Sequence, residues 1–278
     1  MSGAHVAAEA TTAPGLHRAV RARILFRMRT SHNGLVAILV LALPAAAGAQ
    51  TAPRFAVELE GGPVWQTVND VRIPNDASAT RFSLVDLAGH GPVTTGRVYV
   101  SWDLNERHGL RLMAAPFTLK GTGVSANPVR FAGASYVAGV PVAATYRFDS
   151  YRLTWRYRIH RGTRWTWRAG VTAKIRSAEI ALEQGNTASR KPDVGFVPLA
   201  HLDGDGRLGS RLHLLLDVDA LAGGPGRAED VALKLGYDVG RHLTLAGGYR
   251  TVEGGADVKS VYTFAWLHYA VLSAAYRF

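Results

Sequence analysis

The residues from Val261 to Phe278 alternate between two kinds of side chain, and this alternation limits the fold more than any other feature of the sequence. Side chains of a β-strand point alternately to its two faces, so one face of such a strand can meet lipid while the other meets a polar interior. The stretch is long enough to cross a membrane as a tilted strand. One face would carry Phe278, Tyr276, Ala274, Leu272 and Ala270, and the other Arg277, Ala275, Ser273 and Val271.

The same period of two recurs through the chain from Phe55 onward, and no helical apolar period of useful length interrupts it. The pattern predicts an all-β fold, a transmembrane antiparallel up-and-down β-barrel of about ten strands, with eight or twelve as alternatives. A water-soluble β-sandwich explains neither the paired loop lengths nor the placement of aromatic residues. The predicted strands cover residues 55–65, 97–104, 110–119, 140–159, 165–176, 194–203, 211–219, 231–239, 242–251 and 261–278.

The connections between these strands alternate between short turns and other, often longer, segments. Short turns are predicted at residues 105–108, 160–164, 203–210 and 240–241, and they belong on the periplasmic side of a barrel. Loops are predicted after residue 65 and at 120–139, 184–192, 223–227 and 253–257.

The fourth predicted strand contains one ambiguity, because its apolar set changes parity at Asp149. Either a β-bulge or a hairpin turn at Asp149-Ser150 would account for the change. The apolar set before Asp149 is Val142, Ala144, Tyr146 and Phe148, and the set after it is Tyr151, Leu153, Trp155, Tyr157 and Ile159.

The N-terminal residues have the pattern of a signal peptide. Two arginines, Arg27 and Arg29, precede a short apolar core at residues 35–43, and Ala47-Gly48-Ala49 gives the small-x-small pattern of a cleavage site. We therefore expect residues 1–49 to be an N-terminal extension with a cleaved signal peptide, and residues 50–278 to be the barrel. Met28 would begin a compact leader and is the expected start.

Taken together, the leader, the alternating strands and the terminal Tyr-Arg-Phe resemble the outer-membrane β-barrel proteins of Gram-negative bacteria. The resemblance covers residues 50–278 and implies a monomer in the outer membrane, in contact with lipid and lipopolysaccharide. It also implies that the barrel-assembly machinery reads the last strand through Tyr276 and Phe278. Two aromatic girdles are expected. The periplasmic one would contain Phe55, Trp102, Trp155, Tyr157, Trp165, Trp167, Tyr237, Tyr276 and Phe278, and the other Trp65, Phe117, Phe196, Tyr249 and Phe264.

The polar faces of the strands predict a charged barrel interior. Small barrels fill their interiors with side chains, and unpaired charges there are costly, so ion pairs across strands are expected. The predicted lumen-lining residues are Arg97, Arg111, Arg152, Arg156, Arg158, Arg168, Lys174, Arg176, Asp217, Asp219, Lys234 and Asp238, with Asp103 and Glu179 as further carboxylates.

This interior predicts a structural role or a narrow pore that favours anions, as rings of Arg and Lys do. Two alternatives stay open. One is a hydrolase of lipid A, phospholipid or peptide that uses His201 and His213, although no nucleophile motif accompanies them. The other is an adhesin that binds through the loop at residues 69–91. No catalytic residue is assigned.

The remaining composition excludes several kinds of site. The chain has no cysteine, which rules out disulfides and thiolate metal sites. The segment Asp203-Gly204-Asp205-Gly206 resembles the start of a calcium loop, but Leu214 stands where a bidentate Glu is needed, so it is read as a tight turn. The net charge of +11 includes five Arg and one Glu in residues 1–49, and the other basic residues are spread singly along strands, which argues against nucleic-acid binding. We expect no cofactor and no metal.

Overall fold

The computed structural model describes residues 54–278, and the following concerns this part of the chain. The predicted leader, the cleavage after Ala49 and the start at Met28 lie outside the described residues and stay predictions. No helix in the described part is long and apolar enough to span a membrane.

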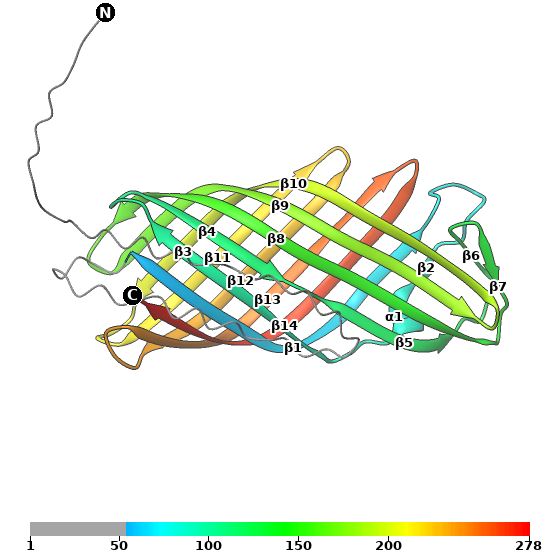
Figure 1. The fold of residues 1–278 in the computed structure, drawn as a ribbon, viewed down its shortest axis with the longest axis horizontal. Helices are drawn as coiled ribbons and strands as arrows, with labels where there is room; N and C mark the ends of the chain where they lie inside the picture. The colour runs from blue at the N-terminus through cyan, green and yellow to red at the C-terminus, as the bar shows by residue number, and fades with distance from the viewer. Residues whose placement is uncertain (1–53) are drawn as a thin grey trace, which may run out of the picture. The chain divides into compact units, whose positions relative to one another are not determined.

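Ten antiparallel strand positions form one closed barrel (Figure 1). Strand β4 and strand β5 share one position, because both pair with β8 on either side of Pro116. The ring closes where β1 pairs with β14, from Ala56 opposite Arg277 to Arg72 opposite Tyr262. The predicted fold class and the count of ten are confirmed. The strands of the wall are β1 (Phe55–Arg72), β3 (Val93–Asp103), β4 (His108–Ala115) with β5 (Thr118–Val124), β8 (Pro141–Arg161), β9 (Trp165–Gln184), β10 (Thr187–Arg207), β11 (Leu212–Gly223), β12 (Gly226–Asp238), β13 (Leu243–Val258) and β14 (Val261–Arg277).

The outer surface of the barrel is an apolar belt bordered by aromatic side chains. Exposed aliphatic residues cover several neighbouring strands; among them are Leu59, Val98, Leu112, Leu153, Val171, Leu233, Leu245 and Leu272. At the end that holds Phe55, Phe278 and the four short turns, here called the terminal end, exposed aromatics include Trp102, Trp155, Tyr237 and Tyr276. A belt of this kind is what a barrel presents to lipid, so the described chain spans a membrane.

The strands are longer than the sequence pattern predicted. Three of the predicted loops at the opposite end, here called the loop end, are two-residue turns at 185–186, 224–225 and 259–260. The residues assigned to those loops continue the strands and pair with a neighbouring strand, for example Glu253 of β13 with Glu229 of β12. A run of polar residues predicts a loop, but a strand that extends beyond the lipid belt has an outer face in water and needs no apolar set there.

Strand β8 is continuous, so neither explanation offered for Asp149 is correct. Its register with β9 runs unbroken from Ala143 opposite Glu183 to Arg158 opposite Arg168. Val142 and Tyr146 point inward, on the same face as Arg152. The same alternate positions of β8 therefore face inward along this length. The side chains at these positions change from polar to apolar toward the loop end.

The segment Asp203-Gly204-Asp205-Gly206 is likewise a strand rather than the predicted turn. It pairs with β9 on one side and β11 on the other, and the turn follows at residues 208–211. A Cβ at Gly204 would lie 2.5 Å from the ring of Trp167, and one at Gly206 would lie 2.3 Å from the ring of Trp165. These glycines therefore make room for the two stacked indoles on the outer face.

Two longer loops gather at the loop end (Figure 1), and their buried apolar side chains pack against the inner wall as an apolar plug. The first connects β1 to β3 and contains β2 (Phe82–Ser83) and α1 (Leu84–Ala88), whose N-cap Ser83 accepts a hydrogen bond from the Val85 amide. The second contains the hairpin of β6 (Val129–Phe131) and β7 (Ala134–Tyr136). Buried residues of both loops join the inner wall in one core; they include Leu84, Leu87, Val129, Phe131 and Tyr136.

Helix α1 lies directly against the inner face of β5. A Cβ at Gly121 would be 2.2 Å from the Ala88 carbonyl oxygen, and one at Gly123 would be 2.2 Å from that of Asp86. Any larger residue would push the helix away from the wall. Phe117, predicted for a girdle, is instead buried in this plug at 5% exposure.

Candidate functional site

The middle of the lumen is occupied by a buried ion-pair cluster, here called the central cluster: Glu60, Arg97, Arg152, Asp230 and Arg250. The Asp230 carboxylate accepts hydrogen bonds from all three arginines, at 2.8 Å from Arg97, 2.7 Å from Arg152 and 2.5 Å from Arg250. Glu60 accepts two more from Arg250, at 2.9 and 3.1 Å. No member is more than 7% exposed. The five residues come from five strands, β1, β3, β8, β12 and β13, so the cluster ties opposite sides of the wall together.

Further pairs extend the central cluster toward the terminal end. Lys234 on β12 donates to Glu58 at 2.5 Å and to Glu60 at 2.9 Å. Asp219 on β11 accepts from Arg152 at 2.8 Å and from the Thr172 hydroxyl at 2.7 Å. Charge-assisted bonds of this kind offset the cost of removing the charges from water.

His201 lies at the edge of this network and touches two carboxylates. Its Nδ1 is 2.8 Å from Asp219, and its Nε2 is 3.1 Å from Asp203. His201, Asp217 and Asp219 have the proximity that a cation site would need. However, Asp217 is already bound through two hydrogen bonds by Arg111, and Asp219 by Arg152 and Thr172. The group is therefore saturated by the protein's own donors.

His213 lies nearer the terminal end, again between two carboxylates. Its ring nitrogens are 2.8 Å from Asp205 and 2.7 Å from Asp238, and Asp238 also accepts from the Thr244 hydroxyl at 2.6 Å. Neither histidine has a hydroxyl positioned against a free ring nitrogen, which acyl transfer would require.

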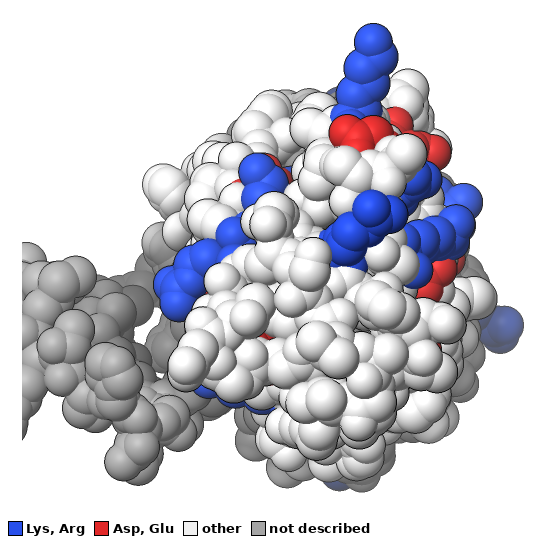
Figure 2. All heavy atoms as spheres, turned by 90° about the vertical axis from the view of Figure 1, so that its right-hand side faces the viewer, with Lys and Arg blue, Asp and Glu red and all other residues white. Residues whose placement is uncertain are grey.

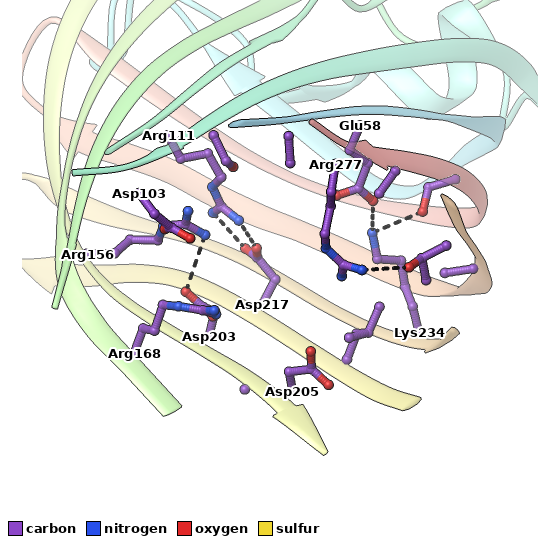
Figure 3. A pocket seen from close by; sticks show the side chains of 18 of the residues that line it. Glu58, Asp103, Arg111, Arg156, Arg168, Asp203, Asp205, Asp217, Lys234 and Arg277 are labelled. Atoms are coloured by element: carbon purple, nitrogen blue, oxygen red, sulfur yellow. Dashed lines mark hydrogen bonds and ion pairs between the residues drawn. The ribbon is translucent and has the colours of Figure 1, made fainter. Parts of the chain in front are cut away.

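A cavity of about 200 Å³ lies between the central cluster and the terminal end of the barrel (Figure 3). Residues from both ends of the described chain line this cavity: Arg54 and Phe55 from its beginning and Arg277 from its end. Deeper in, its wall carries charges of both signs from six strands: Arg111, Arg156, Arg168, Asp203, Asp217 and Lys234.

The structure places the other predicted lumen residues at different levels. Lys174 is 3% exposed and lies 5.0 Å from the ring centroid of Phe148, just below the plug. Arg176 pairs with Asp193 further toward the loop end. Arg158 is half-buried near the terminal end, opposite Arg168 in the β8–β9 register. These residues do not join the central cluster.

Glu179 is the one carboxylate of the proposed inner set that lies on the wrong face. Its neighbour Ile180 is buried inside, and Glu179 pairs on the outer side with Arg147 at 3.9 Å. The strand alternates without a break here, so residues at odd and even positions face opposite sides. Lys174 and Arg176 face inward, and Glu179, at an odd position, must therefore face outward.

Several charged residues of the network were not predicted to line the lumen; they include Glu58, Glu60, Asp203, Asp230 and Arg250. Asp230 shares strand parity with Lys234, which was predicted to face inward, whereas no inward position was predicted on β1 or β13. Applying the alternation beyond the obvious apolar runs would have found them. Their mutual contacts were beyond the sequence, because Glu60 and Arg250 are separated by 190 residues.

The plug lies at the loop end, and the outer face of this end carries charge (Figure 2). Figure 2 shows Lys and Arg side chains gathered on the upper half of this face, while the lower half is largely uncharged. Within the rim, Gln66 donates to the Gly89 carbonyl at 2.6 Å and accepts from Asn69 at 2.8 Å, which fixes the first loop to the wall.

Comparison with solved structures supports the barrel architecture. The structure is similar to the outer-membrane protease OmpT of Escherichia coli, with a TM-score of 0.54 and 9% identity over 84% of this chain and 99% of that one. Weaker similarity exists to Neisserial surface protein A, with a TM-score of 0.35 and 10% identity over 81% of this chain and 97% of that one. The attachment invasion locus protein Ail of Yersinia pestis gives a TM-score of 0.36 and 9% identity, covering 81% of this chain and 99% of that one.

No family model and no curated protein matches the sequence. At 9% identity the likeness to OmpT concerns the fold and carries no residue roles. The closed antiparallel wall, the apolar belt and this likeness agree on one architecture, that of the β-barrels of the Gram-negative outer membrane.

Proposed function

We propose that this Gram-negative outer-membrane β-barrel is a closed, structural barrel rather than an open pore. The observation that carries the proposal is the central cluster, which fills the lumen with paired charges. Arg250 is 1% exposed, Asp230 2% and Glu60 4%, so water has almost no access to this level of the lumen. A conducting pore needs a hydrated path, and its charged rings stay available to ions.

The apolar plug supports the same proposal at a second level. Leu84 and Phe131 are fully buried within the barrel, and Leu87 is 2% exposed. An ion crossing this level would have to leave its water without gaining polar partners, which is strongly unfavourable. The lumen is therefore blocked twice along its axis, once by ion pairs and once by packed apolar side chains.

The hydrolase alternative has less support from the geometry. Both ring nitrogens of His201 and of His213 face carboxylates, so neither ring has a nitrogen free to act as a base. If the lumen is closed, an external partner would bind at the outer face of the loop end. Binding there is the adhesin alternative.

The test is conductance of the purified, refolded protein in a planar lipid bilayer. We expect no discrete current steps, under conditions in which an open porin prepared in the same way gives them. A heat-dependent shift in gel mobility verifies that the barrel is folded. Anion-selective steps that change on charge reversal at Arg156 or Lys174 would contradict the closed barrel and establish the pore.

A further inference from the structure

The arginines around the cavity at the terminal end are incompletely paired. Asp217 holds Arg111 through two hydrogen bonds, and Asp203 accepts from Arg168 at 2.7 Å. Arg156 is 3.8 Å from Asp203, which is beyond hydrogen-bonding distance. Its side chain is nevertheless buried, with 10% of its surface exposed.

The Nε–H group of Arg156 has no acceptor. This atom is buried and makes no hydrogen bond within the described residues, and the same is true of Nε in Arg158. A buried donor without a partner is costly, by about 1–3 kcal/mol or more for a charged group. The cost falls away when a ligand supplies the acceptor.

The local charge also favours an anion. Arg158 and Arg168 stand directly opposite each other on β8 and β9, an arrangement in which like charges repel. Arg156 follows the same inward face of β8 one position deeper. Among the described residues, Arg158 has no ion pair. Asp103 is the carboxylate of the cavity wall that has no ion pair within the described part of the chain, and its negative charge offsets only part of the excess positive charge of the arginines.

We propose that this cavity binds a small oxyanion of the phosphate type, held by Arg156 and Arg168, which line it, while Arg158 adds positive charge opposite Arg168. A guanidinium group offers its Nε–H and one Nη–H as a parallel pair that matches two oxygens of phosphate. The cavity volume corresponds to roughly six waters at about 30 Å³ each, which is room for the ion and part of its hydration shell. Figure 3 shows Arg156 reaching toward Asp203 across this space.

This inference goes beyond the closed-barrel role and does not depend on conduction. The same chemistry fits free phosphate and the phosphate of a lipid head group. The experiment compares inorganic phosphate with glycerophosphoethanolamine, which carries the phosphodiester of a phospholipid head group. Binding of inorganic phosphate alone would mean that the site closes around the whole ion, and binding of both would mean that it also accepts the phosphodiester of a lipid head group.

Calorimetric titration of the refolded protein in detergent measures the binding. Inorganic phosphate should bind the native chain, and R156K, which keeps the charge but loses the paired donors, should bind about tenfold more weakly. D203N removes the competing carboxylate and should bind more tightly. R161Q changes an exposed arginine on the same strand and should bind as the native chain does.

The opposite signs for R156K and D203N separate this proposal from a purely structural role, in which both variants would weaken any binding. The shift in gel mobility confirms folding of each variant before titration. No heat of binding with the native chain for either ligand, or equal weakening by R156K and R161Q, would overturn the proposal.

Discussion

Asp230 is the acceptor that the three arginines of the central cluster share. Three arginines donate to its two carboxylate oxygens, and all four side chains are buried. Removing an anion from such a group leaves cations that neither water nor another carboxylate can fully solvate. The exposed pair of Asp70 and Arg81, also joined at 2.7 Å, lacks this property because its side chains are 27% and 56% exposed.

Asp230→Asn should therefore lower the free energy of unfolding by about 3–5 kcal/mol, because it leaves the arginines short of one buried charge. Asp70→Asn makes the same chemical change in the exposed pair and should cost less than about 1 kcal/mol. Denaturant titration of the two variants in lipid vesicles gives the comparison. Equal losses would show that burial does not set the strength of these pairs.

Strand β8 shows how one element serves three environments. Near the terminal end its outer face carries Trp155, in the belt it carries Leu153, and toward the loop end it carries Arg147. Its inner face changes from Arg156 to Tyr146 over the same length. The same set of alternate residues faces inward along this length of the strand. What changes along the strand is the surroundings of each face, which are polar at some levels and apolar at others.

A positive charge at Leu153 should destabilise the barrel. This side chain is 47% exposed and lies in the apolar belt, one outward position from Trp155 on the side toward Arg147. Leu153→Arg should cost about 2–4 kcal/mol, as Arg does near the bilayer midplane. Leu208→Arg, at an exposed leucine in the 208–211 turn, should cost about 0–1 kcal/mol. Unfolding in lipid vesicles measures both, and a cost at Leu208 as large as at Leu153 would refute the position assigned to the belt.

At the scale of the whole molecule, the barrel has two seals in series. The central cluster joins opposite walls, and the plug closes the loop end. Current through two barriers in series is limited by the less permeable one. Opening either seal alone should therefore leave the bilayer silent.

We expect conductance only when both seals are weakened together. Arg152→Ala with Asp230→Ala empties part of the central cluster without changing net charge, and Leu87→Ala with Phe131→Ala loosens the plug. Each pair alone should give no current steps, and the quadruple variant should give them. Arg147→Ala with Glu179→Ala removes an ion pair of the outer face and serves as the control. Steps from one pair alone would show that the other level is not a barrier.

The sequence by itself predicted a series of strands with two distinct faces and about ten wall positions, because the period of two is a local property of an extended chain. It placed Arg97 and Arg152 inside the barrel, but it did not place Asp230 between them. Those contacts span 133 and 78 residues and depend on how the closed ring staggers its strands.

Tertiary structure alone decided what fills the lumen. Val142, Ala144 and Tyr146 looked like a lipid-facing set, yet they face the plug. An apolar side chain carries the same pattern whether its neighbour is lipid or a folded loop, so the sequence could not tell the two apart. Only the return of α1 and the β6–β7 hairpin into the barrel gives these residues an inward apolar partner, and with it the closed lumen.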